Sequence, residues 1–202
     1  MYNSGITVEE LIEDLKSEVD VAIEIPDKTY VLWLNSLEQL LYSEVIKEQI
    51  SVEGRYLGNG VVEFPELDFS NLSNQYDYLR FEDIYTVFVG DTQLKKTTLT
   101  SGVIFPNCYY KLGESTLGVS AQSGNIKVVF FVRPKLKAPE NLDNQYVMLP
   151  VEFIDLAKAK LRGEAYKLAN EDSLAAKWLN DYNVLLENFK AWIADKSPNF
   201  GL

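Results

Sequence analysis

The fold of this chain is decided at the stretch Ile50-Ser51-Val52-Glu53-Gly54-Arg55-Tyr56-Leu57, where the spacing of the apolar residues changes. Before it, apolar residues recur at every third or fourth position, and from Ile50 they alternate with polar ones. Alternation is typical of a half-buried strand. Gly58-Asn59-Gly60 then predicts a tight turn, and Val61-Val62-Glu63-Phe64 is expected to return as the hairpin partner of the first strand.

Further short strands are predicted downstream of this hairpin, after a polar loop at 66–79. Glycine-containing turns separate them, and they cover 84–89, 93–98, 107–112, 116–119 and 126–132. The unbroken apolar run at 128–132 indicates a central strand with both faces covered. Six or seven short, closely spaced strands predict an antiparallel β-sandwich or small barrel.

Upstream of the strands, the pattern predicts two amphipathic helices. Thr7-Val8-Glu9-Glu10 matches a capping box, in which Thr7 and Glu10 satisfy the first amides of a helix over about 7–20. Ile25-Pro26-Asp27 interrupts the pattern, and Asp27 is expected to be the N-cap of a second helix that ends near Lys47.

Downstream of the strands, two more helices are predicted. Leu149-Pro150 places proline at the first turn of a helix over about 150–169. Asn170-Glu171-Asp172 is interpreted as a C-cap followed by a new N-cap, and a final helix follows at 172–195. Pro198 cannot continue this helix, so the last residues are expected to form a short tail.

The predicted fold class is therefore α+β, with terminal helix pairs that form a four-helix bundle and an inserted β domain. Residues 1–48 and 140–195 are assigned to the bundle, 49–139 to the insertion and 196–202 to the tail. This connectivity keeps each helix pair local in sequence.

The charge of the chain constrains its partners. The formal net charge is −11, which disfavours nonspecific binding to nucleic acid or anionic membrane. Residues 1–25 hold seven acidic residues against Lys16 alone, so this end is either a solvated helix face or a surface that meets a basic partner or keeps nucleic acid from adhering. Residues 1–5 contain no basic or apolar run and no stretch approaches the roughly 20 apolar residues of a membrane span, so we expect no signal peptide and no membrane segment.

The residue types present exclude most catalytic chemistry. The chain has no histidine and a single cysteine, Cys108, which excludes an intramolecular disulfide, a His/Cys zinc site and a histidine-activated nucleophile. Cys108 is expected to be a small buried residue. No phosphate-binding or dinucleotide-binding glycine pattern is present. We therefore expect no catalytic residue, no metal and no cofactor, and the protein is predicted not to be an enzyme.

Two alternatives remain from the residues alone. Paired carboxylates suffice for a glycoside hydrolase, and they could come from Glu63, Glu66, Asp68, Glu82 and Asp83. The aromatic group Tyr76, Tyr78, Phe81 and Tyr85 could be a stacking platform for a sugar or base, or ordinary core and rim packing.

Several segments resemble tailed-bacteriophage head-to-tail connector proteins, also called adaptor or neck proteins. They are Thr7-Val8-Glu9-Glu10-Leu11-Ile12, Trp33-Leu34-Asn35-Ser36-Leu37, Phe130-Phe131-Val132-Arg133-Pro134, Leu149-Pro150-Val151-Glu152-Phe153-Ile154, the alanine-rich helix to Ala169 and the last helix from Trp178 to Phe189. The resemblance covers nearly the whole chain as an order of elements, and 50–125 matches only in kind.

The resemblance implies a structural virion protein that catalyses no reaction. It implies a homo-oligomeric ring of about twelve copies, assembled in the host cytoplasm, that binds the portal and a tail or second neck protein in the virion neck. DNA would pass through without sequence-specific binding. Two sets of residues gain roles under it: the acidic face Glu9, Glu10, Glu13 and Asp14 could line the channel, and Pro198, Phe200 and Leu202 could dock on the portal. The alternative function is a β-sandwich binding module or another tail or baseplate accessory protein.

Overall fold

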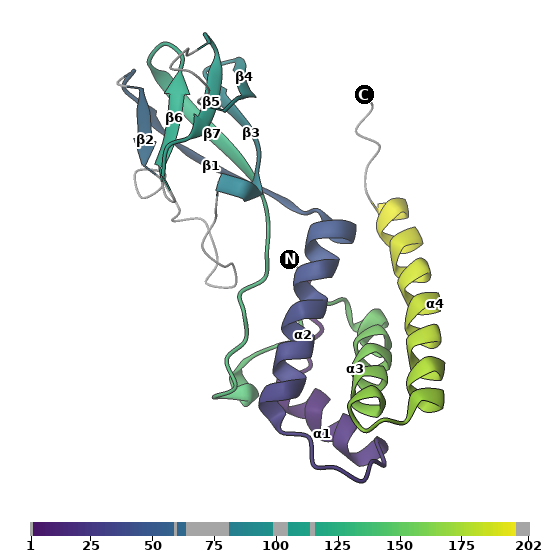
Figure 1. Cartoon of the computed structure of the whole chain (residues 1–202). Coiled ribbons are helices and arrows are strands. Elements are labelled where there is room, and N and C mark those ends of the chain that lie inside the picture. Colours follow the sequence, from purple (N-terminus) through teal and green to yellow (C-terminus); the bar gives the residue numbers. More distant parts are fainter. Residues whose placement is uncertain (1, 59, 64–80, 99–104, 114–115, 197–202) are drawn as a thin grey trace. The chain divides into compact units, whose positions relative to one another are not determined.

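The computed structural model of the chain describes residues 2–58, 60–63, 81–98, 105–113 and 116–196 (Figure 1). It consists of two compact units. The helical unit is formed by Met1–Ile46 with Leu136–Leu202, and the sheet unit is formed by Lys47–Lys135. The boundaries expected after 48 and after 139 lie a few residues downstream of these.

The helical unit contains four α-helices among its described residues. They are α1 (Val8–Glu18), α2 (Asp27–Leu41), α3 (Ile154–Leu168) and α4 (Asp172–Lys196). Shorter turns lie beside them: η1 (Tyr42–Ile46) continues α2 as a π-helical turn, and the 3-10 turns η4 (Leu142–Asn144) and η5 (Val151–Phe153) precede α3.

Local chemistry explains where these helices begin and end. The capping box of α1 is confirmed, because the Glu10 amide donates to the Thr7 hydroxyl at 3.1 Å and the Thr7 amide donates to the Glu10 carboxylate at 2.8 Å. The expected N-cap of α2 is wrong, because Pro26 occupies the N-cap position and Asp27 is the first helical residue. The negative charge of Asp27 interacts favourably there with the positive end of the helix dipole. Asn170 adopts a left-handed φ of 61° after α3, which lets the chain turn into α4.

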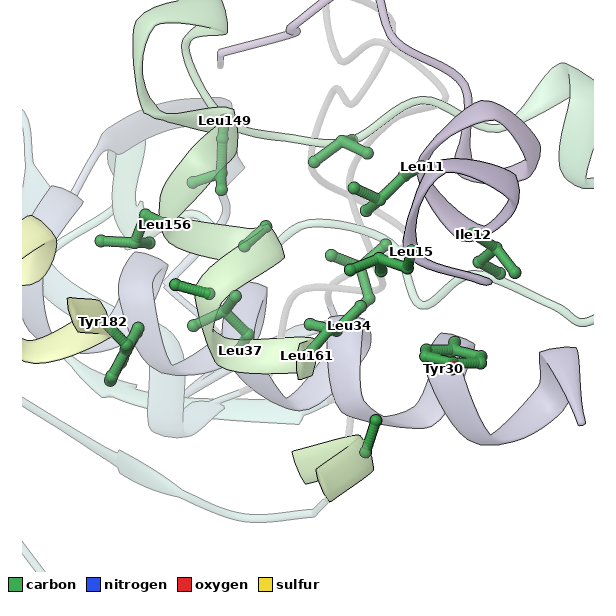
Figure 2. Close-up of a cluster of buried hydrophobic side chains, with 14 of the residues drawn as sticks. Leu11, Ile12, Leu15, Tyr30, Leu34, Leu37, Leu149, Leu156, Leu161 and Tyr182 are labelled. Atoms are coloured by element: carbon green, nitrogen blue, oxygen red, sulfur yellow. The ribbon is translucent and has the colours of Figure 1, made fainter. Parts of the chain in front are cut away.

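One hydrophobic core joins the two terminal segments of the chain. Figure 2 shows side chains from every helix converging on it: Leu11, Ile12 and Leu15 from α1, Tyr30, Leu34 and Leu37 from α2, Leu156 and Leu161 from α3, and Tyr182 from α4. The helix α3 contacts each of the other three helices. A regular four-helix bundle is not confirmed, because α1 lies across the ends of the other helices in Figure 1 and a bundle needs four helices that run nearly parallel.

The sheet unit contains seven strands among its described residues, in a single sheet that is nearly closed on itself. They are β1 (Gln49–Tyr56), β2 (Val61–Glu63), β3 (Ile84–Val89), β4 (Thr92–Lys96), β5 (Cys108–Lys111), β6 (Thr116–Ser120) and β7 (Gly124–Phe131), in the order β1-β7-β3-β4-β5-β6-β2. The α+β class and the small-barrel alternative are therefore confirmed at this level. The strands were expected to be antiparallel throughout, but β4 and β5 run parallel.

The expected β1–β2 hairpin is wrong. β1 pairs with β7 along its whole length, and β2 pairs with β6, so the two consecutive strands lie at opposite edges of the sheet. Gly58 and Gly60, both with positive φ, lie in the connection between these two edge strands. The two edge strands, β1 and β2, are consecutive in the chain but do not form a ladder with each other. The sheet curves, which brings these edges toward each other, and we call the line between them the seam of the barrel.

The central position of β7 is confirmed, because it pairs with β1 on one side and β3 on the other. Only one of its faces is fully covered. Ile126, Val128 and Phe130 are buried in the barrel core, whereas Val129 and Phe131 are half-buried on the outer face. The Phe131 ring meets the exposed Tyr85 ring at a centroid distance of 5.0 Å, which covers part of that face.

Candidate functional site

The predicted acidic face lies on α1, and the structure divides its four carboxylates by role. All four are exposed. Glu10 is engaged in the capping box, and Asp14 accepts a hydrogen bond from the Lys158 ammonium of α3 at 2.8 Å. Glu9 and Glu13, one helical turn apart, have no ion-pair partner among the described residues. They are the members of the set whose charge is available to a partner.

A charged seam connects α1 to α3, and sequence reasoning missed it. Asp14 and Glu18 are four residues apart on α1, and they pair with Lys158 and Arg162, also four residues apart on α3. The i,i+4 spacing puts each pair of like charges on one helix face, so two helices can match them one above the other. The charge pattern of α3 was the signal that could have predicted this seam.

A cavity of about 470 Å³ opens beside this seam, between α3 and α4. Its walls are formed by Asp155, Lys158, Ala159, Arg162, Trp178, Asp181, Val184 and Leu185. The Arg162 guanidinium lies over the Trp178 ring, 4.5 Å from its centroid, and burial lowers the pKa of the guanidinium. Arg162 Nε is buried without a hydrogen-bond acceptor among the described residues. The same arginine therefore holds α1, through Glu18, and α4, through Trp178.

A buried ion pair fastens the returning chain to α2. The Lys137 ammonium donates to the Glu38 carboxylate, and the side chains are 4% and 1% exposed. The Met148 amide donates to the other Glu38 oxygen at 2.8 Å, and Asn35 exchanges two hydrogen bonds with the Lys137 backbone at 2.8 and 2.9 Å. Burial raises the pKa of Glu38, although Lys137 and Met148 act to lower it. A buried ion pair supported by these further hydrogen bonds orders the segment it holds.

In the sheet unit, Tyr56 bridges the seam of the barrel. Its hydroxyl donates to the Val119 carbonyl of β6 at 3.0 Å and accepts from the Gly60 amide at 3.2 Å. A cavity of about 490 Å³ lies beside it, with Pro106, Asn107, Tyr110 and Gln122 among its walls. Cys108 is buried on the neighbouring strand β5, as the sequence predicts.

The carboxylates considered for hydrolysis do not form an acid–base pair where the structure describes them. Glu82 is bound to Lys111 at 2.5 Å, and this hydrogen bond lowers the pKa of Glu82. Asp83 is bound to Arg133 at 2.6 Å. A general acid needs a raised pKa, which the hydrogen bond from Lys111 to Glu82 opposes. Glu63 lies on β2, and Glu66 and Asp68 are outside the described residues.

The aromatic group is only partly described. Phe81 is buried against Tyr109, with ring centroids 6.0 Å apart, and Tyr85 is exposed beside Phe131. Tyr76 and Tyr78 lie outside the described residues, as do Pro198, Phe200 and Leu202 of the expected docking tail. Phe81 therefore packs in the barrel core, which leaves Tyr85 as the exposed aromatic of the described pair.

No protein family matches the chain, and no curated protein matches it. Within the described residues, no group of three His, Cys, Asp or Glu side chains could hold a metal ion, and no helix is long and apolar enough to cross a bilayer.

Proposed function

We propose that this protein is a structural subunit of a phage neck, which forms a ring between the portal and the tail and extends the DNA channel. Each subunit would sit in a homo-oligomeric ring of about twelve copies in the virion neck, assembled in the host cytoplasm. Its partners would be the portal protein and a tail or second neck protein. The protein would work through shape and assembly, without a catalytic step.

The observation that supports this proposal best is the organisation of the chain. Both terminal segments contribute to one helical core, and residues 47–135 form a separate unit between them. This is the organisation that the resemblance to connector proteins implies, with the helical unit in the place of the connector's four-helix bundle. Such a design lets the inserted unit differ among relatives while the helical unit keeps its contacts.

The charge on α1 supports a position near passing DNA. Glu9 and Glu13 are exposed and unpaired among the described residues, and the whole chain carries −11. A negative wall repels phosphates, so DNA can move past it without adhering. In the proposed ring, this side of α1 faces the lumen.

The proposal is tested by assembly with the portal encoded next to this gene. Wild-type chain mixed with that portal should give rings in electron micrographs and a portal-bound peak in mass photometry. A chain ending at residue 196 lacks Pro198, Phe200 and Leu202, so it should lose portal binding while its thermal unfolding stays unchanged. If the wild-type chain binds no portal from its own genome neighbourhood, the proposal is wrong.

The lumenal assignment needs a separate variant. Glu9→Lys with Glu13→Lys should leave ring formation intact and give the ring a measurable, salt-sensitive affinity for double-stranded DNA. The matched control is Glu152→Lys with Glu187→Lys, which makes the same charge change at two exposed positions outside α1. Equal DNA affinity of both variants would contradict a lumenal α1.

The cavity beside Tyr56 favours one second candidate, a binding module in the sheet unit. Its volume of about 490 Å³ suits a sugar, and Tyr110, Asn107 and Gln122 offer aromatic and hydrogen-bonding surface. A glycan array that gives a signal with wild type and none with Asn107→Ala would establish this function. An array without signal would remove it.

A further inference from the structure

The outward side of α2 carries a ridge of exposed residues that the described residues of the helical unit do not cover. Its members are spaced four residues apart and continue into η1: Lys28, Leu32, Ser36, Leu40 and Glu44. All five are exposed, and the leucines are exposed by 64% and 48%. The opposite side of α2 is buried in the helical core. Burying the two exposed leucines of this ridge against a partner would lower the free energy of the protein.

The ridge is complementary to itself when it is reversed. Ser36 is its midpoint, with one leucine on each side and an opposite charge at each end. In an antiparallel pair with its two-fold axis at Ser36, Leu32 lies beside Leu40 of a second copy, and Lys28 lies toward Glu44 of that copy. Each contact occurs twice. Neither Lys28 nor Glu44 has an ion-pair partner among the described residues, so the pairing brings together two charges that the monomer leaves apart.

The chemistry at the midpoint permits close approach. Ridges of residues at i, i+4 and i+8 pack into the matching grooves of another helix at the commonest crossing angle, about −50°. A small residue at the crossing point lets the two backbones come near. The Ser36 hydroxyl already donates to the Leu32 carbonyl at 2.9 Å, so covering it leaves no unsatisfied donor.

We propose that the α2 ridge binds a second copy of this chain in a two-fold, antiparallel helix pair. A two-fold contact uses the same surface on both copies and is complete in a dimer. A ring of about twelve copies repeats a head-to-tail contact between two different surfaces. The dimer is therefore a state of the free protein and does not rest on the proposed ring. The interface is small, so its Kd is expected near ~100 µM.

The test is sedimentation velocity of the full-length chain at concentrations from about tenfold below to about tenfold above that Kd, in about 0.15 M salt. Wild type should show a monomer–dimer equilibrium. Leu32→Glu should abolish the dimer, because it places a carboxylate from each copy in an apolar contact. Leu168→Glu is the matched control, since Leu168 is likewise exposed but lies on α3 and is not part of the ridge. The control should dimerise like wild type, and thermal unfolding followed by circular dichroism should be alike in both variants.

The register is tested by charge reversal. Lys28→Glu and Glu44→Lys each place like charges together and should raise the dimer Kd about tenfold. An equimolar mixture of these two variants restores opposite charges at the ends of the ridge, so a heterodimer should form with higher affinity than either variant alone. Wild-type chain that stays monomeric at the highest concentration, a dimer that survives Leu32→Glu, open-ended polymers, or a mixture that fails to recover would each overturn the proposal.

Discussion

The sheet unit and the helical unit differ in which parts of the chain build their cores. The core of the sheet unit is built from residues between Val52 and Phe130, and the ladders that surround it join strands that lie between Gln49 and Phe131. The core of the helical unit joins residues 8–41 to residues 147–193, and a buried ion pair links Glu38 to Lys137 across 99 positions. The sheet unit is therefore contiguous in the chain, whereas the helical unit needs both ends of it. This difference predicts how each unit responds to truncation and substitution.

The largest expected effect comes from cutting the chain at the unit boundaries. A fragment of residues 47–135 should fold alone, because its core and its ladders are complete. A fragment of residues 1–46 should stay unfolded, because its apolar stripes lose the helices they pack against. Circular dichroism and thermal unfolding of each fragment measure this. Mixing 1–46 with 136–202 should recover helical signal, and an unfolded 47–135 would contradict the comparison.

Removing the buried cation should destabilise the helical unit selectively. Lys137→Met leaves the Glu38 carboxylate buried without its ion-pair partner, which costs about 3 kcal/mol in the free energy of unfolding. The double variant Glu38→Leu with Lys137→Met should recover most of the loss, because it removes both charges. Urea unfolding followed by Trp fluorescence reports on the helical unit, which contains all three tryptophans. Equal losses in the single and double variants would show that the loss does not come from an unpaired charge on Glu38.

The same variant should show a pH dependence of known sign. The pKa of Glu38 is already raised by burial, and Lys137 acts to lower it, so Lys137→Met should raise it further. A carboxyl group with a raised folded-state pKa contributes stability below its ordinary pKa of 4.5, and this contribution is lost as pH rises through the folded value. The stability loss in Lys137→Met should therefore be small near pH 4.5 and grow toward about pH 7. Unfolding free energies of wild type and variant between these pH values measure it.

The smallest expected effects come from replacing one closely packed glycine in each unit by alanine. A Cβ at Gly118 would overlap the Tyr110 ring in the barrel, and a Cβ at Gly163 would lie 2.7 Å from Leu179 Cδ2 between α3 and α4. Gly118→Ala should cost about 2 kcal/mol through overpacking. Gly163→Ala should cost about 1 kcal/mol, since the better helix propensity of alanine offsets part of the clash.

The control for this pair is Gly124→Ala, whose Cβ would be 3.4 Å from Val89 Cγ1 and should change stability by less than about 0.5 kcal/mol. Thermal unfolding of the full-length chain measures all three variants. If Gly163→Ala lowers the free energy of unfolding more than Gly118→Ala does, the prediction is wrong, and α3 and α4 are packed more tightly at Gly163 than the barrel is at Gly118.

The elements themselves could be predicted from the sequence to a large extent. The α1 capping box, the strand at Ile84–Val89 and the left-handed turn at Asn170 all follow from signals a few residues long. The roles of the candidate surface residues could be predicted less well from the sequence. Asp14 looks equivalent to Glu13 in the sequence, but its neighbour Lys158 is 144 positions away and changes its role.

What the sequence by itself determined is the type and order of the elements: helices at both ends, strands in the middle, and an acidic first helix. These depend on spacing, capping and turn chemistry, which act over a few residues. Only the tertiary structure decided which strands pair, that β1 and β2 lie at opposite edges, that Glu38 meets Lys137, and that Leu32 and Leu40 of α2 are exposed. The physical reason is that these choices compare the burial and pairing of segments far apart in the chain, and local propensity carries no information about that comparison.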